Sequence, residues 1–499
     1  MPRSLIAAAR MVAVSNPDRL SGLDASFLAL EDAGSHMHVG SVILFDGPAP
    51  PYDDVLAGLE SRLHLVPRYR QKLAFPPLQA GRPVWVDDPH FNPRYHLRHG
   101  ALPPPAGEDE LRTLAGRVFA QRLDRSKPLW ELWLIDRVGE DRFALVTKTH
   151  HCLVDGVSGV DLATVLFDLA PEPPAAEAPR PWFPRPEPSA AALLADALAE
   201  RARGPADVLG GVRHAVMHPE RAAGVLSGVL SIARVAGLPG LGGAPRSPFN
   251  VPIGPHRRFA WVEGDLAQFK AVKAALGGTV NDVVLAVVTG ALRTHLLREG
   301  HDADEFELKA MVPVSVRAEA ERGALGNRVT TMYAPLPVYA EDPLERFAIV
   351  HDSMAGLKES GQAVGAEVLT RLAGFAPPTV LAQAARLQGV QRLFNLTITN
   401  VPGPQFPLYM SGRRMRALYP QVPLTKNTAL GIAIMSYDGA LDFGLVSDFD
   451  ALPNVDRVAG DLHTSIRQLT AAAGVGMGVG QPQGNGRAPR PERDPARAR

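Results

Sequence analysis

Three shortages in the sequence limit what this protein can be. Cys152 is the one cysteine in 499 residues, which excludes an internal disulfide framework and a cysteine-based structural zinc site. Neither sign of charge prevails, with 52 Lys and Arg against 52 Asp and Glu, so no overall field attracts nucleic acid or an anionic membrane. Apolar stretches near 225–241 and 283–292 are interrupted or fall short of the roughly 20 residues that span a bilayer. We therefore expect a cytoplasmic protein without a nucleic-acid partner, whose contact with any membrane is peripheral.

The rest of the composition is typical of a folded chain with two domains. Hydrophobic residues make up 46% and charged residues 21%, close to the globular average. A chain of this length exceeds what one core serves and favours two domains of about 200 residues each. Prolines crowd 171–188, and periodicity ends near 474. The predicted order is an N-terminal extension at 1–20, a first subdomain at 21–170, a linker with connector helices at 171–248, a second subdomain at 249–473 and a disordered tail at 474–499.

Helical and strand patterns alternate along both predicted subdomains. Apolar residues recur three and four positions apart in five segments, which predicts amphipathic helices at 53–65, 108–123, 266–276, 280–297 and 455–471. Runs bounded by Gly, Pro and Asp predict strands at 39–45, 84–86, 95–98, 132–136, 143–149, 308–316, 329–336, 393–399, 430–437 and 441–448. Turn residues near 138–141 and 437–439 join strand pairs into hairpins. The pattern predicts a mixed α+β fold.

The strongest chemical signal lies at the end of a predicted strand, in the sequence THHCLVDGVS. Successive strand residues point to opposite faces, so His150 and His151 cannot both serve one site while the chain is extended. One is expected to be catalytic and the other structural, and the same geometry counts against a metal site. Asp155 suits a helix cap or an orienting ion-pair partner, while Gly156 permits close backbone approach.

These residues form an HHxxxDG motif and resemble the coenzyme A-dependent acyltransferase superfamily. Within it, the chain resembles the bacterial wax ester synthase/diacylglycerol acyltransferase family over residues 20–472. The resembling segments are Leu23-Asp24-Ala25-Ser26-Phe27, His36-Met37-His38, Pro128-Leu129-Trp130, Asn281-Asp282-Val283-Val284, Met311-Val312-Pro313-Val314-Ser315 and Asn400-Val401-Pro402-Gly403-Pro404. Their order and spacing both agree with the family.

The resemblance implies two chloramphenicol-acetyltransferase-like subdomains around a central tunnel, joined by a helical connector. It implies transfer of a long-chain acyl group from acyl-coenzyme A, as co-substrate, to the hydroxyl of diacylglycerol or of a fatty alcohol, with no further cofactor and no metal. The second histidine of the motif, His151, would be the general base, and Asp155 would pair with an arginine. No covalent acyl-enzyme is expected, and Cys152 is expected to be dispensable because it faces away from His151 if the strand persists.

Several family segments allow a structural as well as a functional interpretation. Asn281 is a candidate oxyanion donor at a helix start, but Thr279 and Asp282 also form a capping-box pattern there. Pro128, Leu129 and Trp130 could line the acyl channel or belong to the core. Asn400 could shape the tunnel mouth or end a strand.

Two other functions remain open from the sequence. A condensation-type enzyme for another hydroxyl or amine acceptor shares the HHxxxDG motif, although the chain has no room for a carrier domain. A catalytically silent lipid-binding protein could keep the fold, but the intact His151, Asp155 and Gly156 count against it. The expected location is the cytoplasm, with peripheral contact to a membrane or lipid droplet.

Overall fold

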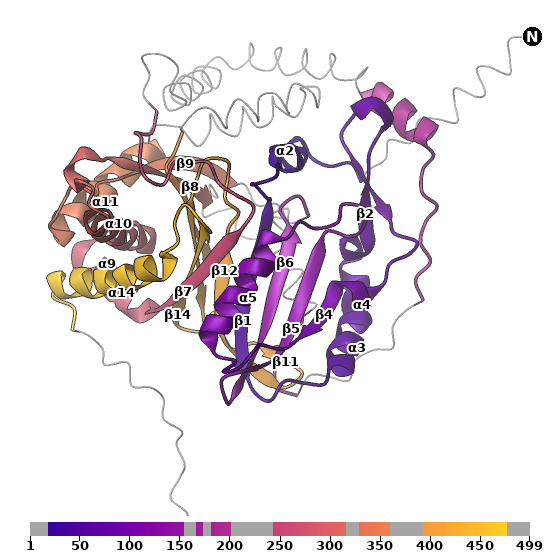
Figure 1. Cartoon of the computed structure of the whole chain (residues 1–499), viewed down its shortest axis with the longest axis horizontal. Coiled ribbons are helices and arrows are strands. Elements are labelled where there is room, and N and C mark those ends of the chain that lie inside the picture. Colours follow the sequence, from indigo (N-terminus) through magenta and orange to yellow (C-terminus); the bar gives the residue numbers. More distant parts are fainter. Residues whose placement is uncertain are drawn as a thin grey trace, which may run out of the picture.

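A computed structural model describes residues 18–153, 166–172, 181–200, 243–315, 329–359 and 393–476. Asp155 and Gly156 lie outside the described residues, as do most of the predicted connector helices and both ends of the chain. The described part has two six-stranded sheets and one two-stranded sheet, with helices packed on them (Figure 1).

The first sheet has the strand order β11-β12-β1-β6-β5-β4. Its strands are β1 (His38–Asp46), β4 (Leu97–Gly100), β5 (Trp130–Val138), β6 (Arg142–His150), β11 (Tyr409–Met410) and β12 (Arg413–Gln421). All neighbours are antiparallel except β4 and β5. The predicted hairpin is confirmed, because β5 and β6 pair directly and Gly139 has the positive φ of 66° that their turn requires.

Alternation along these strands gives the first sheet two apolar faces. Ile43 and Phe143 belong to one core cluster, with helices α2 and α3 packed against it, whereas Val42 and Ala144 belong to another that includes α5. The helices and smaller elements of this half are α2 (Gly22–Leu30), α3 (Tyr52–Arg62), α4 (Pro93–His96), α5 (Glu108–Ala120), β2 (Gln71–Ala74), β3 (Val84–Asp87), η1 (Leu63–Leu65), η2 (Pro67–Arg70) and η3 (Pro77–Gln79).

The second sheet has the order β7-β14-β13-β10-β8-β9, with β10 parallel to both of its neighbours. Its strands are β7 (Arg257–Asp265), β8 (Leu308–Ser315), β9 (Val329–Leu336), β10 (Leu396–Pro402), β13 (Leu430–Tyr437) and β14 (Ala440–Asp448). The helices of this half are α9 (Leu266–Leu276), α10 (Val280–Arg298), α11 (Pro343–Glu359), α14 (Val455–Ala472) and the short η4 (Ala303–Glu305). They gather on one side of the sheet, away from the first half (Figure 1).

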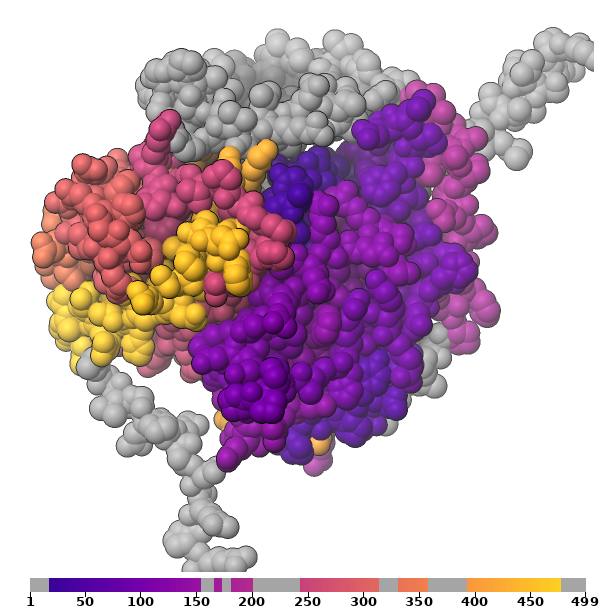
Figure 2. Space-filling model, in the orientation of Figure 1, coloured from indigo at the N-terminus to yellow at the C-terminus, as the bar shows by residue number. Residues whose placement is uncertain are grey.

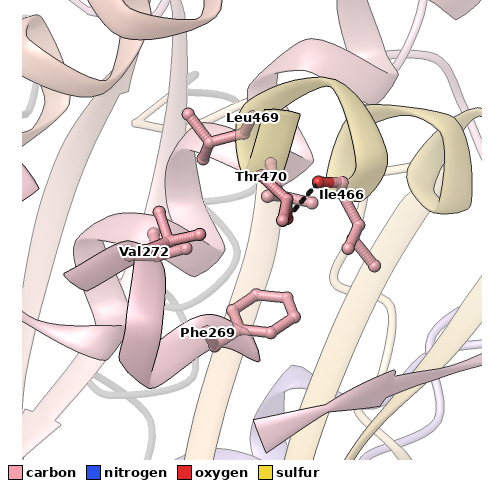
Figure 3. A pocket seen from close by; sticks show the side chains of 7 residues that line it. Phe269, Val272, Ile466, Leu469 and Thr470 are labelled. Carbon is pink, nitrogen blue, oxygen red and sulfur yellow. Dashed lines mark hydrogen bonds between the residues drawn. The ribbon is translucent and has the colours of Figure 1, made fainter. Parts of the chain in front are cut away.

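Helix α10 is the centre of the second core. Among the described helices it alone is long and apolar enough to cross a membrane, but 72% of its most apolar window is buried in the protein. Core helices pass the same composition test, and α10 packs against α9, α11 and α14. A small apolar pocket lies between α9, α10 and α14, where Phe269 and Val272 face Leu469 (Figure 3).

The halves meet along a continuous seam (Figure 2). By sequence, strand β12 belongs to the predicted second subdomain at 249–473, but it pairs with β1 and so completes the first sheet. It also crosses close to β14, since a Cβ at Gly444 would lie 1.8 Å from the Pro420 carbonyl oxygen. Trp261 of β7 stacks on Tyr419 of β12 at 4.9 Å, which closes the seam with aromatic contacts. The predicted subdomain boundaries stay a prediction.

Most predicted elements are present, with one correction. The strand predicted at 95–98 begins only at Leu97, because Pro93 to His96 form a short helix. Asn92 caps this helix by accepting from the Arg94 amide at 3.0 Å, and Pro93 occupies its first position. Helices α2 and α11 and strands β2, β7, β11 and β12 were not predicted.

Candidate active site

The two histidines lie where β6 ends. The His150 amide still donates to the Leu129 carbonyl at 2.9 Å, and the His151 amide donates to the Met37 carbonyl at 2.7 Å. The chain then turns, with the Leu153 amide donating to the His150 carbonyl at 2.9 Å. The His150 ring lies beside Glu31, whereas the His151 ring stacks on Phe27, so the two imidazoles have separate surroundings.

His150 is a buried, hydrogen-bonded group. Only 1% of it is exposed, and its Nδ1 accepts from the Cys152 amide at 3.1 Å. An accepting Nδ1 leaves the proton on Nε2, which lies 3.3 Å from Glu31 Oε1. This arrangement suits the structural role expected for one histidine of the pair.

Glu31, which sequence reasoning missed, is the carboxylate at the centre of this cluster. Its Oε1 accepts from the Met37 amide at 3.0 Å, and its Oε2 accepts from Arg125. Burial alone would raise the pKa of the Glu31 carboxyl, but His150 and Arg125 outweigh burial and hold that pKa well below its usual range. Glu31 directly follows α2 and carries no periodic or motif signal, so only the folded chain reveals its partners.

His36 and His38 complete the histidine cluster as neutral groups. Burial lowers the pKa of His36 to about 4 and that of His38 well below its usual value. The ring of His38 lies 5.9 Å from that of His150, and its Nε2 lies 3.7 Å from Glu31 Oε1. The imidazoles of His36 and His38 are therefore uncharged at neutral pH.

His151 has apolar surroundings instead. Its ring stacks on Phe27 of α2 with 4.0 Å between centroids, and the residue as a whole keeps part of its surface exposed. Burial lowers the pKa of His151 to about 4, below the near-neutral value that suits a free acid–base group. Within the described part of the chain, its buried Nδ1 has no hydrogen-bond partner. The imidazole is therefore a neutral proton acceptor at physiological pH.

Cys152 is a poor candidate for a nucleophile. Only 3% of it is exposed, and burial raises the pKa of its thiol further above its usual value. The chain leaves the strand at this point, so its orientation follows from a turn and not from strand alternation. Its dispensability stays a prediction.

The structure brings the Pro128-Leu129-Trp130 segment directly beside the histidines. The Leu129 carbonyl accepts the His150 amide, and Leu129 and Trp130 are 0% and 1% exposed. The Trp130 indole donates to the Tyr69 carbonyl at 2.8 Å, and its ring stacks on His96 at 4.4 Å. This burial favours the core interpretation, in which the segment supports the end of β6.

At the start of α10 the capping pattern is confirmed. The Thr279 hydroxyl accepts from the Asp282 amide at 3.2 Å, while the Asp282 carboxylate accepts from the Thr279 amide at 2.8 Å. Nδ1 of His351 on α11 lies 3.1 Å from the same carboxylate oxygen. Because Thr279 and Asp282 make the cap, the side chain of Asn281 is available for another role.

Asn281 and Asn400 come together although 119 positions separate them. The Asn400 Nδ2 donates to Asn281 Oδ1 over a long 3.5 Å. Both side chains are half-buried, and Asn400 lies near the end of β10. The two family segments therefore form one amide cluster in the second half, and its role in binding stays a prediction.

Comparison with known proteins gives the relationship of the whole chain. The protein-family model for the wax ester synthase/diacylglycerol acyltransferase catalytic domain matches residues 20–284. The family model for the WS/DGAT C-terminal domain matches residues 325–470. The proteins named probable diacylglycerol O-acyltransferase tgs1 and tgs2 of Mycobacterium tuberculosis are 33% and 35% identical to it. These alignments cover 91% of this chain and 96% and 98% of the two relatives.

Solved structures agree with these matches. A wax ester synthase/diacylglycerol acyltransferase from Marinobacter aquaeolei VT8 superposes with a TM-score of 0.63 at 30% identity, covering 92% of this chain and 100% of that chain. The starter condensation domain of rhizomide synthetase superposes with a TM-score of 0.55 at 13% identity, which shows a shared fold alone. The chain belongs to the wax ester synthase/diacylglycerol acyltransferase family.

Proposed function

We propose that this protein transfers a long-chain acyl group from acyl-coenzyme A to the hydroxyl of diacylglycerol, giving triacylglycerol. A long-chain fatty alcohol is the second acceptor, giving a wax ester. The observation that carries the proposal is the neutral imidazole of His151, a partly exposed residue at the end of a strand in a chain of this acyltransferase family.

In the proposed reaction His151 is the general base. Its imidazole takes the proton of the acceptor hydroxyl as the oxygen attacks the thioester carbonyl, and a C–O bond forms. The tetrahedral intermediate then collapses, the C–S bond breaks, and the imidazolium returns the proton to the departing thiolate. The low pKa of His151 favours the second transfer, and it makes acceptor binding necessary to align the first.

Direct transfer fits the other groups near His151. The buried Cys152 thiol stays protonated, so it offers no nucleophile for a covalent acyl-enzyme. We assign His150 to positioning, through Glu31, and the pairing of Asp155 with an arginine stays a prediction. Asn281 is our candidate for the oxyanion donor, because the helix cap does not use its amide.

The substrates also support a location. Diacylglycerol and fatty alcohols reside in membranes and droplets, whereas acyl-coenzyme A is delivered from water. We therefore propose a cytoplasmic enzyme that works in peripheral contact with a lipid surface, and a tunnel between the halves through which both substrates reach His151.

Product analysis tests the proposal. Purified protein is incubated with palmitoyl-coenzyme A and dioleoylglycerol, hexadecanol or no acceptor, while thiol release is followed and the lipids are identified by mass spectrometry. We expect acceptor-dependent thiol release with triacylglycerol or wax ester in equal amount. Thiol release without lipid product would indicate hydrolysis, and no release with either acceptor would favour another acceptor or a silent site.

A further inference from the structure

Residues 32–37, here called the linking loop, lie between α2 and β1 and contact both His151 and Glu31 through the backbone of Met37. The Met37 carbonyl accepts from the His151 amide at 2.7 Å, and the Met37 amide donates to Glu31 Oε1 at 3.0 Å. The backbone of Met37 thus holds both the residue that carries the proposed base and the carboxylate beside His150. A displacement of this loop moves both groups.

The other end of the linking loop rests on the second half. The Ser35 hydroxyl donates to the Leu424 carbonyl at 2.7 Å. A Cβ at Gly34 would lie 2.6 Å from the Ile253 carbonyl oxygen, so the two backbones touch where only glycine fits. Figure 1 shows α2, which leads into this loop, at the boundary between the halves.

Arg257, at the start of β7, fastens this contact. Its guanidinium donates to the Gly34 carbonyl across the seam and to the Gly254 and His256 carbonyls, at 2.7 and 2.8 Å, in its own half. Arg257 is 6% exposed, and Asp448 Oδ2 lies 3.6 Å from it. A buried charge is costly unless it is paired and hydrogen-bonded, so these partners fix the guanidinium in one place.

We propose that Arg257 is a positioning residue for acyl transfer, which fastens the linking loop to the second half and, through the Met37 backbone, holds His151 in line for reaction. The proposal rests on the proposed function of His151. Arginine suits this role because its planar guanidinium presents several donors in fixed directions. The lysine side chain is shorter and flexible, and its ammonium group has no fixed fork.

The kinetic test compares Arg257→Met and Arg257→Lys with a matched control, Arg258→Met. Arg258 is the next residue, but it donates to the Phe449 carbonyl and lies over the Phe449 ring, away from the linking loop. We expect Arg257→Met to lower kcat at least ~10-fold with the KM for palmitoyl-coenzyme A changed less than ~3-fold, because misplaced groups lose rate more than affinity. Arg257→Lys should recover part of kcat, and Arg258→Met should match the wild type.

A second pair of variants tests a substitution in the linking loop itself against a control elsewhere. Gly34→Ala places a methyl group against the Ile253 carbonyl and should lower kcat in the same way, whereas Gly58→Ala, where nothing lies within 4 Å, should not. If Arg257→Met fails to fold, this pair carries the test. Unchanged kcat in folded Gly34→Ala and Arg257→Met would overturn the proposal.

The titration of His151 separates positioning from general damage. It is followed by NMR in histidine-labelled protein and assigned with His151→Gln. We expect loosening of the loop in Arg257→Met to admit water and raise the pKa of His151 toward 6.5, with Arg258→Met unchanged. An unmoved titration would contradict the proposal. If wild type transfers no acyl group but the titration moves, the loop linkage stands and the proposed function fails.

Discussion

In the first half, one buried carboxylate holds the histidines at the end of β6, whereas in the second half the start of α10 is held by a capping box. Glu31 contacts His150, Arg125 and the Met37 amide, and 5% of its side chain is exposed. Thr279 and Asp282 bond each other's amides at the helix start, where Asp282 is buried. The difference teaches that the carboxylate of the first half joins segments far apart in the chain, whereas that of the second half bonds mainly within its own helix start.

Among the changes that test this comparison, removing the charge of Glu31 should have the largest effect on kcat. Glu31→Gln keeps the shape but leaves Arg125 and His150 facing a neutral amide, so kcat should fall ~10-fold to ~100-fold, because a small misplacement of reacting groups can cost about 100-fold in rate. Steady-state thiol release measures it. Glu60→Gln on the exposed side of α3 is the control, and a Glu31→Gln enzyme with wild-type kcat would contradict the central place of this carboxylate.

The seam between the halves contains a carboxyl, that of Asp442, whose pKa is raised, whereas the pKa of Glu31 is lowered. Asp442 is fully buried on β14 and accepts from the Leu418 amide of β12 at 2.8 Å; burial raises its pKa to about 8. The folded state therefore binds a proton that the unfolded state releases above its own pKa near 3.8. Stability contributed by Asp442 is present at low pH and declines by up to ~1.4 kcal/mol per pH unit as pH rises toward 8.

Asp442→Asn should remove this decline. Chemical denaturation at pH 5.5 and pH 8 measures the free energy of unfolding. That of the variant should increase relative to that of the wild type as pH rises. Asp54→Asn, at an exposed position on α3, is the surface control. Equal pH dependence in Asp442→Asn and wild type would show that Asp442 is ionised in the folded seam.

The pH dependence of catalysis tests the surroundings of His151. Its folded pKa of about 4 lies below the usual 6.5, so the neutral base persists as pH falls and is lost only near pH 4. kcat/KM should change less than ~2-fold between pH 7.5 and 5.5, where a base of pKa 6.5 would lose ~10-fold. Circular dichroism at each pH checks folding. A tenfold fall with the fold intact would mean that the imidazole is solvated.

The smallest effect is expected at the cap of α10. Thr279→Ala removes the hydroxyl that accepts the Asp282 amide and should lower stability by about 1 kcal/mol. Because the cap serves the helix and not the reaction, kcat should stay near wild type when measured well below the melting temperature. A large loss of kcat without a change in melting temperature would place Thr279 in the site instead.

The sequence predicts elements well where local pattern decides structure. Helix α9 was predicted with its observed bounds, because its apolar spacing and the Asp265 cap act locally. The turn at 138–141 fixed the hairpin that carries His150. Strand β12 escaped prediction because Pro420 lies within it and its first four residues include three arginines, so its place beside β1 follows only from tertiary pairing.

The residues of the candidate site likewise fall into those that a local pattern identifies and those that only the folded chain reveals. The HHxxxDG motif marked His150 and His151 from sequence alone, the strand period predicted that only one of them serves the site, and the family resemblance pointed to His151. Glu31, the Met37 backbone and Arg257 could not be found, since each acts through a contact between segments far apart in the chain. The same holds for the meeting of Asn281 with Asn400. Local chemistry is readable from motifs, whereas the groups that orient it depend on packing.

The central claim is that His151 supplies the base for acyl transfer. Acceptor-dependent thiol release from palmitoyl-coenzyme A is compared in wild type, His151→Ala and Cys152→Ala at matched folded concentrations. The account predicts that His151→Ala loses ~10²-fold to ~10⁴-fold in rate, as removal of a general base does, while Cys152→Ala stays active. A His151→Ala enzyme that keeps the wild-type rate would contradict it.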